Sequence, residues 1–248
     1  MNLEGKVAVI TGSAVRIGRA MALSLAEAGV DLCIHYHLSQ AAAEQTCAEI
    51  RERGRNATRV SANLSDPVTA AAVIFEAALS EFGKVDILIN SASVFENKRL
   101  SDSTEADWDS HLDINLKSPF FLCQRFAEQL PPGQSGAIVN LVDWRAKRAG
   151  AEHLAYRISK AGLVTLTECL ALDLAPAIQV NAIAPGAILP PPGEDMSYLD
   201  ERAQKAPLKR AGSPAEICHA LLYLLRSDFV TGEVLTVAGG EQLTGGRG

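Results

Sequence analysis

The sequence predicts an α/β protein in which a parallel β-sheet is covered by helices on both faces. Apolar runs of strand length alternate with longer segments of helical period along the chain. Each parallel pair of strands needs a crossover connection, and helices normally supply it. A chain of 248 residues is long enough for one large domain with a well-buried core, and no linker, repeat or low-complexity segment divides it. We therefore expect a single domain over residues 1–248.

The first half of the chain carries strong signals for where its helices begin and end. Gly29 and Gly54 close two helical segments. Asp66 and Pro67 suit the cap and first turn of a third helix, which stops before Gly83. In order, we expect strand 6–11, helix 17–28, strand 32–36, helix 39–53, strand 57–61, helix 66–82 and strand 85–90.

The second half continues the alternation. Two helical stretches precede a fifth strand, and the long helical segment after it has an apolar stripe formed by Leu163, Leu166, Leu170 and Leu174. A sixth strand, a loop, another helix and a last strand complete the series. In order, we expect helices 104–115 and 119–130, strand 137–142, helix 153–175, strand 179–184, helix 214–225 and strand 234–237.

Composition excludes several classes of function. The formal net charge is −6 and no cluster of Lys and Arg is dense enough for a phosphate backbone, so nucleic acid is not an expected partner. No segment approaches the roughly 20 uninterrupted apolar residues of a membrane span. The N-terminus also lacks the features of a signal peptide, so we expect a cytoplasmic protein without membrane contact. The five cysteines are scattered without a Cys-x-x-Cys pair, and we interpret them as reduced core thiols; no metal site is expected.

The segment at 140–160, NLVDWRAKRAGAEHLAYRISK, holds candidate catalytic side chains. Tyr156 and Lys160 are four residues apart, so a helix places the phenol and the ammonium on one face, one turn apart. A lysine cation makes a phenolate less costly, and we expect it to bring the pKa of Tyr156 far below its usual value of about 10. Tyr156 is then a candidate general acid. Isolated Tyr-x-x-x-Lys pairs are common in helices, so this assignment needs support from the rest of the chain.

A glycine-containing turn follows the first expected strand, with the sequence TGSAVRIG at 11–18. Gly12 and Gly18 permit a tight turn and close packing, and the N-terminus of the next helix offers free amides to a pyrophosphate. After the first strand of an alternating α/β chain, such a turn predicts dinucleotide binding rather than a purely structural bend.

Together these motifs resemble the short-chain dehydrogenase/reductase family over nearly the full chain. The matching pieces are the TGSAVRIG turn, NSAS at 90–93, Asn115, the Tyr156/Lys160 pair and Pro185-Gly186. The resemblance implies a Rossmann-like, doubly wound sheet of about seven parallel strands. It also implies a cofactor-binding part over about 1–140, a catalytic and substrate-binding part over about 141–248, and a homotetramer.

The same resemblance assigns roles to individual residues. Tyr156 is expected to be the proton donor, Lys160 to hold the ribose of a nicotinamide cofactor, and Asn115 to support a proton relay, with a helix cap or turn as the alternative for Asn115. The residues expected at the cofactor are Gly12, Arg16, Ile17, Gly18, His35, Tyr36, His37, Ser39, Asn63, Leu64, Asn90, Ser91, Ala92, Tyr156, Lys160, Pro185 and Gly186.

The sequence favours NADP(H) as that cofactor. The end of the second strand, HYHLS at 35–39, has no acid to accept an adenosine ribose hydroxyl. Arg16 and the Ser39 hydroxyl suit a 2′-phosphate instead, with a surface salt bridge as the alternative for Arg16. Leu38 stands where some relatives have an arginine, which weakens the preference for the phosphate.

Asp143 departs from the common family pattern, in which a serine hydrogen-bonds the substrate carbonyl. A carboxylate repels a developing alkoxide, but it suits a substrate with N–H groups or with a ring nitrogen that must be protonated. Asp143, Arg16, the HYHLS run and Phe95 together resemble the pteridine reductases and dihydromonapterin reductases. In that subgroup the aspartate lies beside the catalytic tyrosine, a phenylalanine matching Phe95 stacks on the flat pterin, and a serine matching Ser93 helps to hold it. Core packing is the alternative for Phe95.

The sequence therefore supports one main hypothesis and two alternatives. The main hypothesis is an NADPH-dependent reductase of a pterin-like C=N bond, with Asp143, Tyr156, Lys160 and Asn115 as catalytic residues and Ser93, Phe95, Asp143 and Tyr156 at the substrate. A carbonyl reductase of the 3-oxoacyl or small-ketone kind, with Asp143 as a protonated donor, is the first alternative. A non-catalytic NADP-binding redox sensor is the second, although a sensor has no need of Tyr156, Lys160 and Asn115 together.

Overall fold

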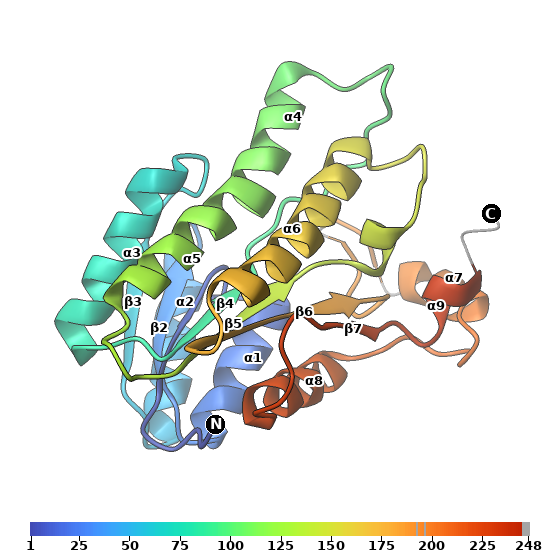
Figure 1. Ribbon diagram of the computed structural model, residues 1–248. Coiled ribbons are helices and arrows are strands. Elements are labelled where there is room, and N and C mark those ends of the chain that lie inside the picture. The colour runs from blue at the N-terminus through green and yellow to red at the C-terminus, as the bar shows by residue number, and fades with distance from the viewer. Residues whose placement is uncertain (192, 196, 245–248) are drawn as a thin grey trace.

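The molecule is built on one seven-stranded parallel sheet with the strand order β3-β2-β1-β4-β5-β6-β7 (Figure 1). The computed structural model describes residues 1–191, 193–195 and 197–244. All six neighbouring pairs are parallel. The strands are β1 (Val7–Ile10), β2 (Asp31–Tyr36), β3 (Ala57–Ser61), β4 (Ile87–Asn90), β5 (Gly136–Leu141), β6 (Ile178–Pro185) and β7 (Val234–Val237). The predicted fold class is confirmed.

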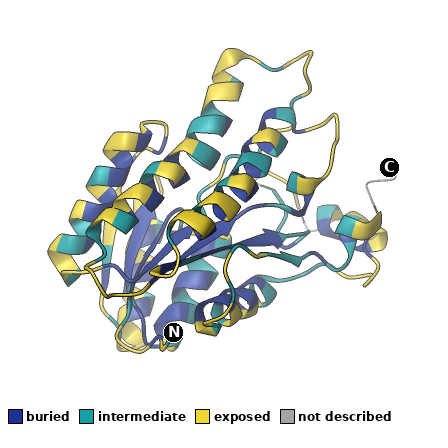
Figure 2. Ribbon diagram, in the orientation of Figure 1, coloured by how far each residue is buried: buried dark blue, intermediate teal, exposed yellow. Residues whose placement is uncertain are grey.

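Helices cover both faces of this sheet. On one face lie α1 (Arg16–Glu27), α2 (Gln40–Glu52) and α8 (Pro214–Arg226), and on the other lie α3 (Pro67–Phe82), α5 (Ser118–Gln129) and α6 (Leu154–Asp173). Ala8 and Ile10 pack into the first layer and Val9 packs into the second, because side chains alternate along a strand. The central strands β1, β4 and β5 are thus buried from both sides (Figure 2), which explains why they read as nearly continuous apolar runs.

The strand order reverses at β1, which lies between β2 and β4. After β3 the chain crosses back and continues the sheet from β4 on the other side of β1. Crossover connections leave the sheet in opposite directions at this point, so a crevice opens beyond the carboxyl ends of β1 and β4. The glycine turn follows β1 and the NSAS segment follows β4, so both motifs meet at this crevice.

The two helices predicted at 104–115 and 119–130 are joined, and the predicted gap between them is wrong. Helix α4 (Glu105–Leu112) continues through one π-helical turn, η1 (Asp113–Lys117), directly into α5. In this turn the amide of Ser118 donates to the carbonyl of Asp113, five residues back. Pro119 has no N–H to offer the carbonyl of Asn115, yet the helix passes through this wider turn into α5 without a break.

Helix α7 (Ser197–Lys205) lies in the stretch predicted to be a loop, and α9 (Glu241–Thr244) and the 3₁₀ turn η2 (Trp144–Lys147) were also not predicted. The sequence of α7, SYLDERAQK, is mostly polar, and within it only Leu199 and Ala203 are buried. A segment with so little apolar surface has no helical stripe to detect.

Two predictions from composition can be compared with the structure. Cys33, Cys47, Cys123 and Cys218 are buried free thiols, but Cys169 is exposed on α6, so its interpretation as a core residue is wrong. Among the described residues, no helix combines the length and the apolar character that crossing a bilayer requires.

Candidate functional site

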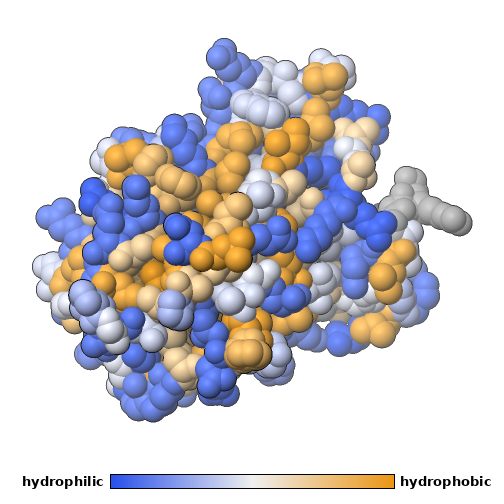
Figure 3. Space-filling view, in the orientation of Figure 1, coloured by the Kyte–Doolittle hydropathy of each residue, from blue (hydrophilic) through white to orange (hydrophobic). Residues whose placement is uncertain are grey.

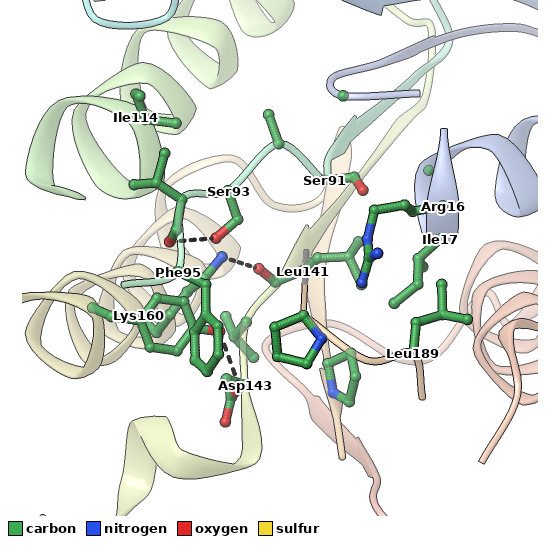
Figure 4. Close-up of a pocket in the computed structure, with 18 of the residues that line it drawn as sticks. Arg16, Ile17, Ser91, Ser93, Phe95, Ile114, Leu141, Asp143, Lys160 and Leu189 are labelled. Carbon is green, nitrogen blue, oxygen red and sulfur yellow. Dashed lines mark hydrogen bonds between the residues drawn. The ribbon is translucent and has the colours of Figure 1, made fainter. Parts of the chain in front are cut away.

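A cavity of about 680 Å³ lies at the crevice beyond the carboxyl ends of the central strands (Figure 4). Of the residues predicted at the cofactor, its walls include Gly12, Arg16, Ile17, Gly18, His35, His37, Asn63, Leu64, Ser91, Ala92, Tyr156, Lys160, Pro185 and Gly186. Of those predicted at the substrate, they include Ser93, Phe95, Asp143 and Tyr156. Four predicted residues do not line it, namely Tyr36, Ser39, Asn90 and Asn115.

The glycine turn brings the backbone after β1 against the backbone after β4. Gly12 has φ +63°, and a Cβ there would lie 2.9 Å from Ala92 Cα. The Thr11 hydroxyl accepts hydrogen bonds from the amides of Ser91 at 2.9 Å and Ala92 at 3.0 Å. A side chain at residue 12 would therefore clash with Ala92, and glycine allows the two backbone segments to approach this closely.

The first turn of α1 is open to an anion. Its N-cap residue, Val15, makes no side-chain capping bond, so the first amides of the helix are free to meet a negatively charged group. Arg16, the first residue of α1, lines the same cavity and donates to the carbonyl of Pro190 at 2.6 Å. A glycine turn, an uncapped helix N-terminus and a guanidinium form a set of donors that fits the phosphates of a dinucleotide. Pro190, Pro191 and Pro192 follow one another in the sequence and are expected to stiffen the loop after Pro185-Gly186; this run begins here, and Pro192 lies outside the described residues.

The ring of His35 forms a hydrogen bond with the glycine turn. Its Nδ1 accepts from the Gly12 amide at 3.1 Å, so the proton must sit on Nε2, which lies 3.1 Å from the carbonyl of Ala62. Burial lowers the pKa of His35 to about 4 from its usual 6.5, despite the bond to Ala62. The ring is therefore neutral at physiological pH and holds the turn through both nitrogens.

We expect the free energy of unfolding to fall as the pH drops from about 6.5 to about 4, because His35 is neutral in the folded protein over this range. The unfolded chain binds a proton at this residue near pH 6.5, whereas the folded chain does so only near pH 4. Folding is then weakened by roughly 3 kcal/mol as the pH falls between those values. Urea unfolding at several pH values measures the slope of the free energy of unfolding against pH. His35→Asn is expected to flatten it, His37→Asn at the exposed neighbour is expected to retain it, and an unchanged slope in His35→Asn would contradict the assignment.

Tyr156 is the centre of the acid-base chemistry. Its buried hydroxyl donates to Asp143 Oδ2 at 2.9 Å. Burial, and then the negative charge of Asp143 and this hydrogen bond, raise the pKa of Tyr156 well above 10. The prediction that this pKa lies far below 10 is wrong, because desolvation and the carboxylate raise it. Tyr156 is therefore a protonated phenol, which suits a proton donor.

Lys160 lies on the same face of α6 but does not bond the phenol. Its Nζ donates to the carbonyl of Leu141 at 2.7 Å, the contact drawn in Figure 4, and lies 5.8 Å from the centre of the Tyr156 ring. Burial lowers the pKa of Lys160 to about 8, against the opposing pull of Asp143. The ammonium is thus held at the cavity wall, one helical turn from the phenol, as the spacing predicted.

Asp143 forms an ion pair with Arg145, a residue that the sequence did not single out. Arg145 Nη1 lies 3.1 Å from Oδ2 and 3.3 Å from Oδ1 of Asp143, and the Arg145 amide donates to Oδ1 at 2.7 Å. With the phenol of Tyr156, every one of these contacts donates to the carboxyl group, which is what an ionised carboxylate requires. Arg145 is itself buried and stacks on Trp144 at 4.9 Å, so its place in the site depends on folding and carries no local sequence signal.

Phe95 presents only part of its surface to the cavity. The ring of His153 is stacked on it, with centroids 4.3 Å apart and planes within 14°, and Tyr156 meets it edge-on at 4.7 Å. His153 has a left-handed backbone (φ 56°) at the N-cap of α6 and bonds the carbonyl of Glu96. One face of Phe95 is covered by protein, and a flat ligand would have to use the remaining face.

Asn115 and Asn90 form hydrogen bonds that join the protein segments around the site. Asn115 is fully buried in the π-turn, where it accepts from the Val94 amide at 2.9 Å and donates to the Val94 carbonyl and the Ser159 hydroxyl. It thereby ties the segment before Phe95 to α6. Asn90 donates to Asn140 at 2.8 Å, across β4 and β5. The Asn115 side chain is thus fully engaged by the protein, whereas the buried Oδ1 of Asn90 has no hydrogen-bond partner among the described residues.

Comparison with known proteins gives a consistent picture across the full chain. A family model described as enoyl-(acyl carrier protein) reductase matches residues 12–242. A (2S)-[(R)-hydroxy(phenyl)methyl]succinyl-CoA dehydrogenase subunit, BbsD, of Thauera aromatica is 35% identical, over 99% of this chain and 100% of its own. The 3-oxoacyl-[acyl-carrier-protein] reductase FabG of Staphylococcus aureus (strain N315) is 33% identical, over 95% of this chain and 97% of its own.

Solved structures share the fold closely. FolM alternative dihydrofolate reductase 1 from Brucella canis, complexed with NADP, has a TM-score of 0.91 at 32% identity, covering 98% of this chain and 96% of that one. A blue fluorescent protein from a metagenomic library, in complex with NADPH, has a TM-score of 0.89 at 32% identity, covering 97% and 99%.

Proposed function

Because the chain belongs to the short-chain dehydrogenase/reductase family, we propose that it is an NADPH-dependent reductase of a flat, pterin-like substrate with a C=N bond. The cofactor is NADP(H), as the sequence predicts, and the FolM and blue fluorescent protein structures contain NADP and NADPH. The observation that carries the substrate class is the carboxylate of Asp143 hydrogen-bonded to the proton donor Tyr156. The likeness to a FolM dihydrofolate reductase supports the same class.

In the proposed reaction the cofactor supplies a hydride and Tyr156 supplies a proton. When bound, NADPH supplies the hydride, which adds to the carbon of the C=N bond. Tyr156 gives its hydroxyl proton to the ring nitrogen, so that one N–H and one C–H bond form as the double bond is lost. The Lys160 ammonium stabilises the phenolate left behind. Asp143, held as a carboxylate by Arg145, accepts a hydrogen bond from the substrate's N–H groups and orients the phenol.

A carbonyl reductase is the second candidate, and the identity to 3-oxoacyl-[acyl-carrier-protein] reductases over 95% of the chain favours it. An ionised Asp143 opposes it, since an alkoxide developing beside a carboxylate is repelled. The test is to mix the protein with NADPH and, separately, 7,8-dihydropterins, 3-oxoacyl thioesters and diketones, and to follow NADPH absorbance. Turnover of the carbonyl compounds alone would overturn the pterin proposal, and tight NADPH binding with no turnover of any compound would favour a sensor.

Arg16 is expected to discriminate between the two nicotinamide dinucleotides. Arg16→Gln should raise KM for NADPH by about tenfold through the loss of a charge-assisted contact to the 2′-phosphate, and should leave KM for NADH within about twofold. Arg19→Gln, on the same helix, removes an equal charge that pairs with Glu49 at 2.6 Å and serves as the control. Equal effects on the two dinucleotides would show that Arg16 does not read the phosphate.

The family resemblance also leads us to propose a homotetramer that uses α5 and α6 as contact surfaces. Figure 3 shows apolar side chains over these helices on one face of the molecule. Phe120 on α5 is 44% exposed and Leu172 on α6 is 85% exposed. Such residues would gain from burial in an interface. Size-exclusion chromatography with light scattering tests this proposal.

A further inference from the structure

The end of the cavity that faces α7 is rich in arginine, although the whole chain carries a net charge of −6. Arg145 and Arg202 both line it, and Arg157 on α6 lies near enough that burial and the charge of Arg145 both lower its pKa, with Arg202 contributing in the same direction. Asp143 neutralises Arg145. A cluster of cations at the mouth of a low-dielectric cleft attracts anions.

Arg202 differs from Arg145, which is paired with Asp143, and from Arg157, whose guanidinium donates to the carbonyls of Glu152 and Arg148. Within the part of the chain that the structure describes, it forms no salt bridge; its one polar contact is a long hydrogen bond of 3.4 Å to the hydroxyl of Tyr198. The guanidinium lies 5.5 Å from the centre of the Tyr198 ring. Both residues belong to α7, so the tyrosine ring positions the guanidinium, and among the described residues only one of its N–H groups has a hydrogen-bond partner.

Arg202 lies in the wall between two cavities. With Ala187, it also lines a second cavity of about 490 Å³, whose walls include Pro207, Leu208 and Leu243. Glu241, the acid that borders this second cavity beside Ala187, is buried and accepts from the Ala187 amide at 3.1 Å. Within the described residues Glu241 forms no salt bridge with Arg202, although the charge of Arg202 lies near enough to lower the pKa of Glu241 against the larger effect of burial. A ligand that extends from the large cavity toward α7 would therefore meet the Arg202 guanidinium at the wall.

We infer that Arg202 is an anion subsite that binds a carboxylate on the substrate, at a distance from the bond that is reduced. A guanidinium offers a planar pair of donors that matches a carboxylate, and its position half-buried at the cavity wall strengthens that contact relative to open water. This inference rests on the proposed reductase function and adds a substrate feature to it: the reducible ring occupies the part of the cavity beside Tyr156, and an acidic side arm extends to α7.

The test compares Arg202→Gln, Arg202→Lys and the control Arg226→Gln. Arg226 is the exposed last residue of α8 and lines neither cavity, so its replacement removes the same charge elsewhere. Each protein is assayed with 7,8-dihydrofolate, which has an acidic arm, and with 7,8-dihydrobiopterin, which has a neutral one. A keto acid and its neutral amide form a second pair. Calorimetric titration of the NADP⁺ complex with the two dihydropterins measures binding independently of turnover.

Arg202→Gln is expected to lower kcat/KM for the acidic member of a pair by about tenfold and to leave the neutral member within about twofold. Arg202→Lys should recover part of the loss, and Arg226→Gln should resemble the unchanged protein. Equal losses for acidic and neutral ligands, or no preference for the acidic ligand in the titrations of the unchanged protein, would overturn the inference. If only the ketone pair is turned over, the pterin proposal fails while Arg202 is still tested by that pair.

Discussion

Replacing Tyr156 by Phe is expected to lower kcat for dihydropterin reduction by about a hundredfold to ten-thousandfold, the usual contribution of a positioned general acid. The substitution removes one hydroxyl that donates to Asp143 and keeps the ring that packs edge-on against Phe95. Asp143 remains held by Arg145, so the walls of the cavity should keep their arrangement. Affinity for NADPH should therefore change by less than about threefold.

Single-turnover oxidation of NADPH measures the chemical step, and fluorescence titration measures cofactor binding. Tyr223→Phe is a matched control, because this tyrosine is 56% exposed on α8 and lines neither cavity. Near-normal turnover in Tyr156→Phe would refute its role as proton donor and, with it, the assignment of the active site.

Replacing Asp143 by Ser is expected to reduce both stability and activity, for separable reasons. Arg145 is only 8% exposed, and without Asp143 its charge is buried and unpaired. Removing one partner of a buried ion pair typically costs about 3–5 kcal/mol. Dihydropterin reduction should suffer more than ketone reduction, because only the nitrogen heterocycle uses the carboxylate as a hydrogen-bond acceptor.

The double variant Asp143→Ser/Arg145→Met separates the two effects. It removes both charges, so urea unfolding should show much of the lost stability restored. Its dihydropterin kcat/KM should stay low, since a neutral hydroxyl is a weaker hydrogen-bond acceptor than the missing carboxylate. Equal losses on dihydropterin and ketone substrates in both variants would remove the argument that Asp143 selects a pterin.

Much of the frame of this site could be predicted because its signals are local. The central strands are short apolar runs buried from both sides, and Gly29, Gly54 and Asp66 mark helix ends within a few residues of where they lie. The prediction failed at the junction of α4 and α5 and at α7. In the first case Pro119 does not separate the two helices, because a π-helical turn joins α4 to α5 directly before it. In the second, a polar helix has no periodic signal.

Along the chain, residue spacing by itself determined that Tyr156 and Lys160 share a helix face and that a glycine turn follows the first strand. Only the tertiary structure decided what these groups do to one another. Burial and the nearby carboxylate raise the pKa of Tyr156, and Lys160 donates to the carbonyl of Leu141 instead of the phenol. Arg145 forms an ion pair with Asp143, and α7 places Arg202 at the wall of the cavity. The ring of His153 covers one face of Phe95, which lies 58 residues earlier in the sequence. Desolvation and long-range packing set these properties, and neither is encoded in the spacing of neighbouring residues.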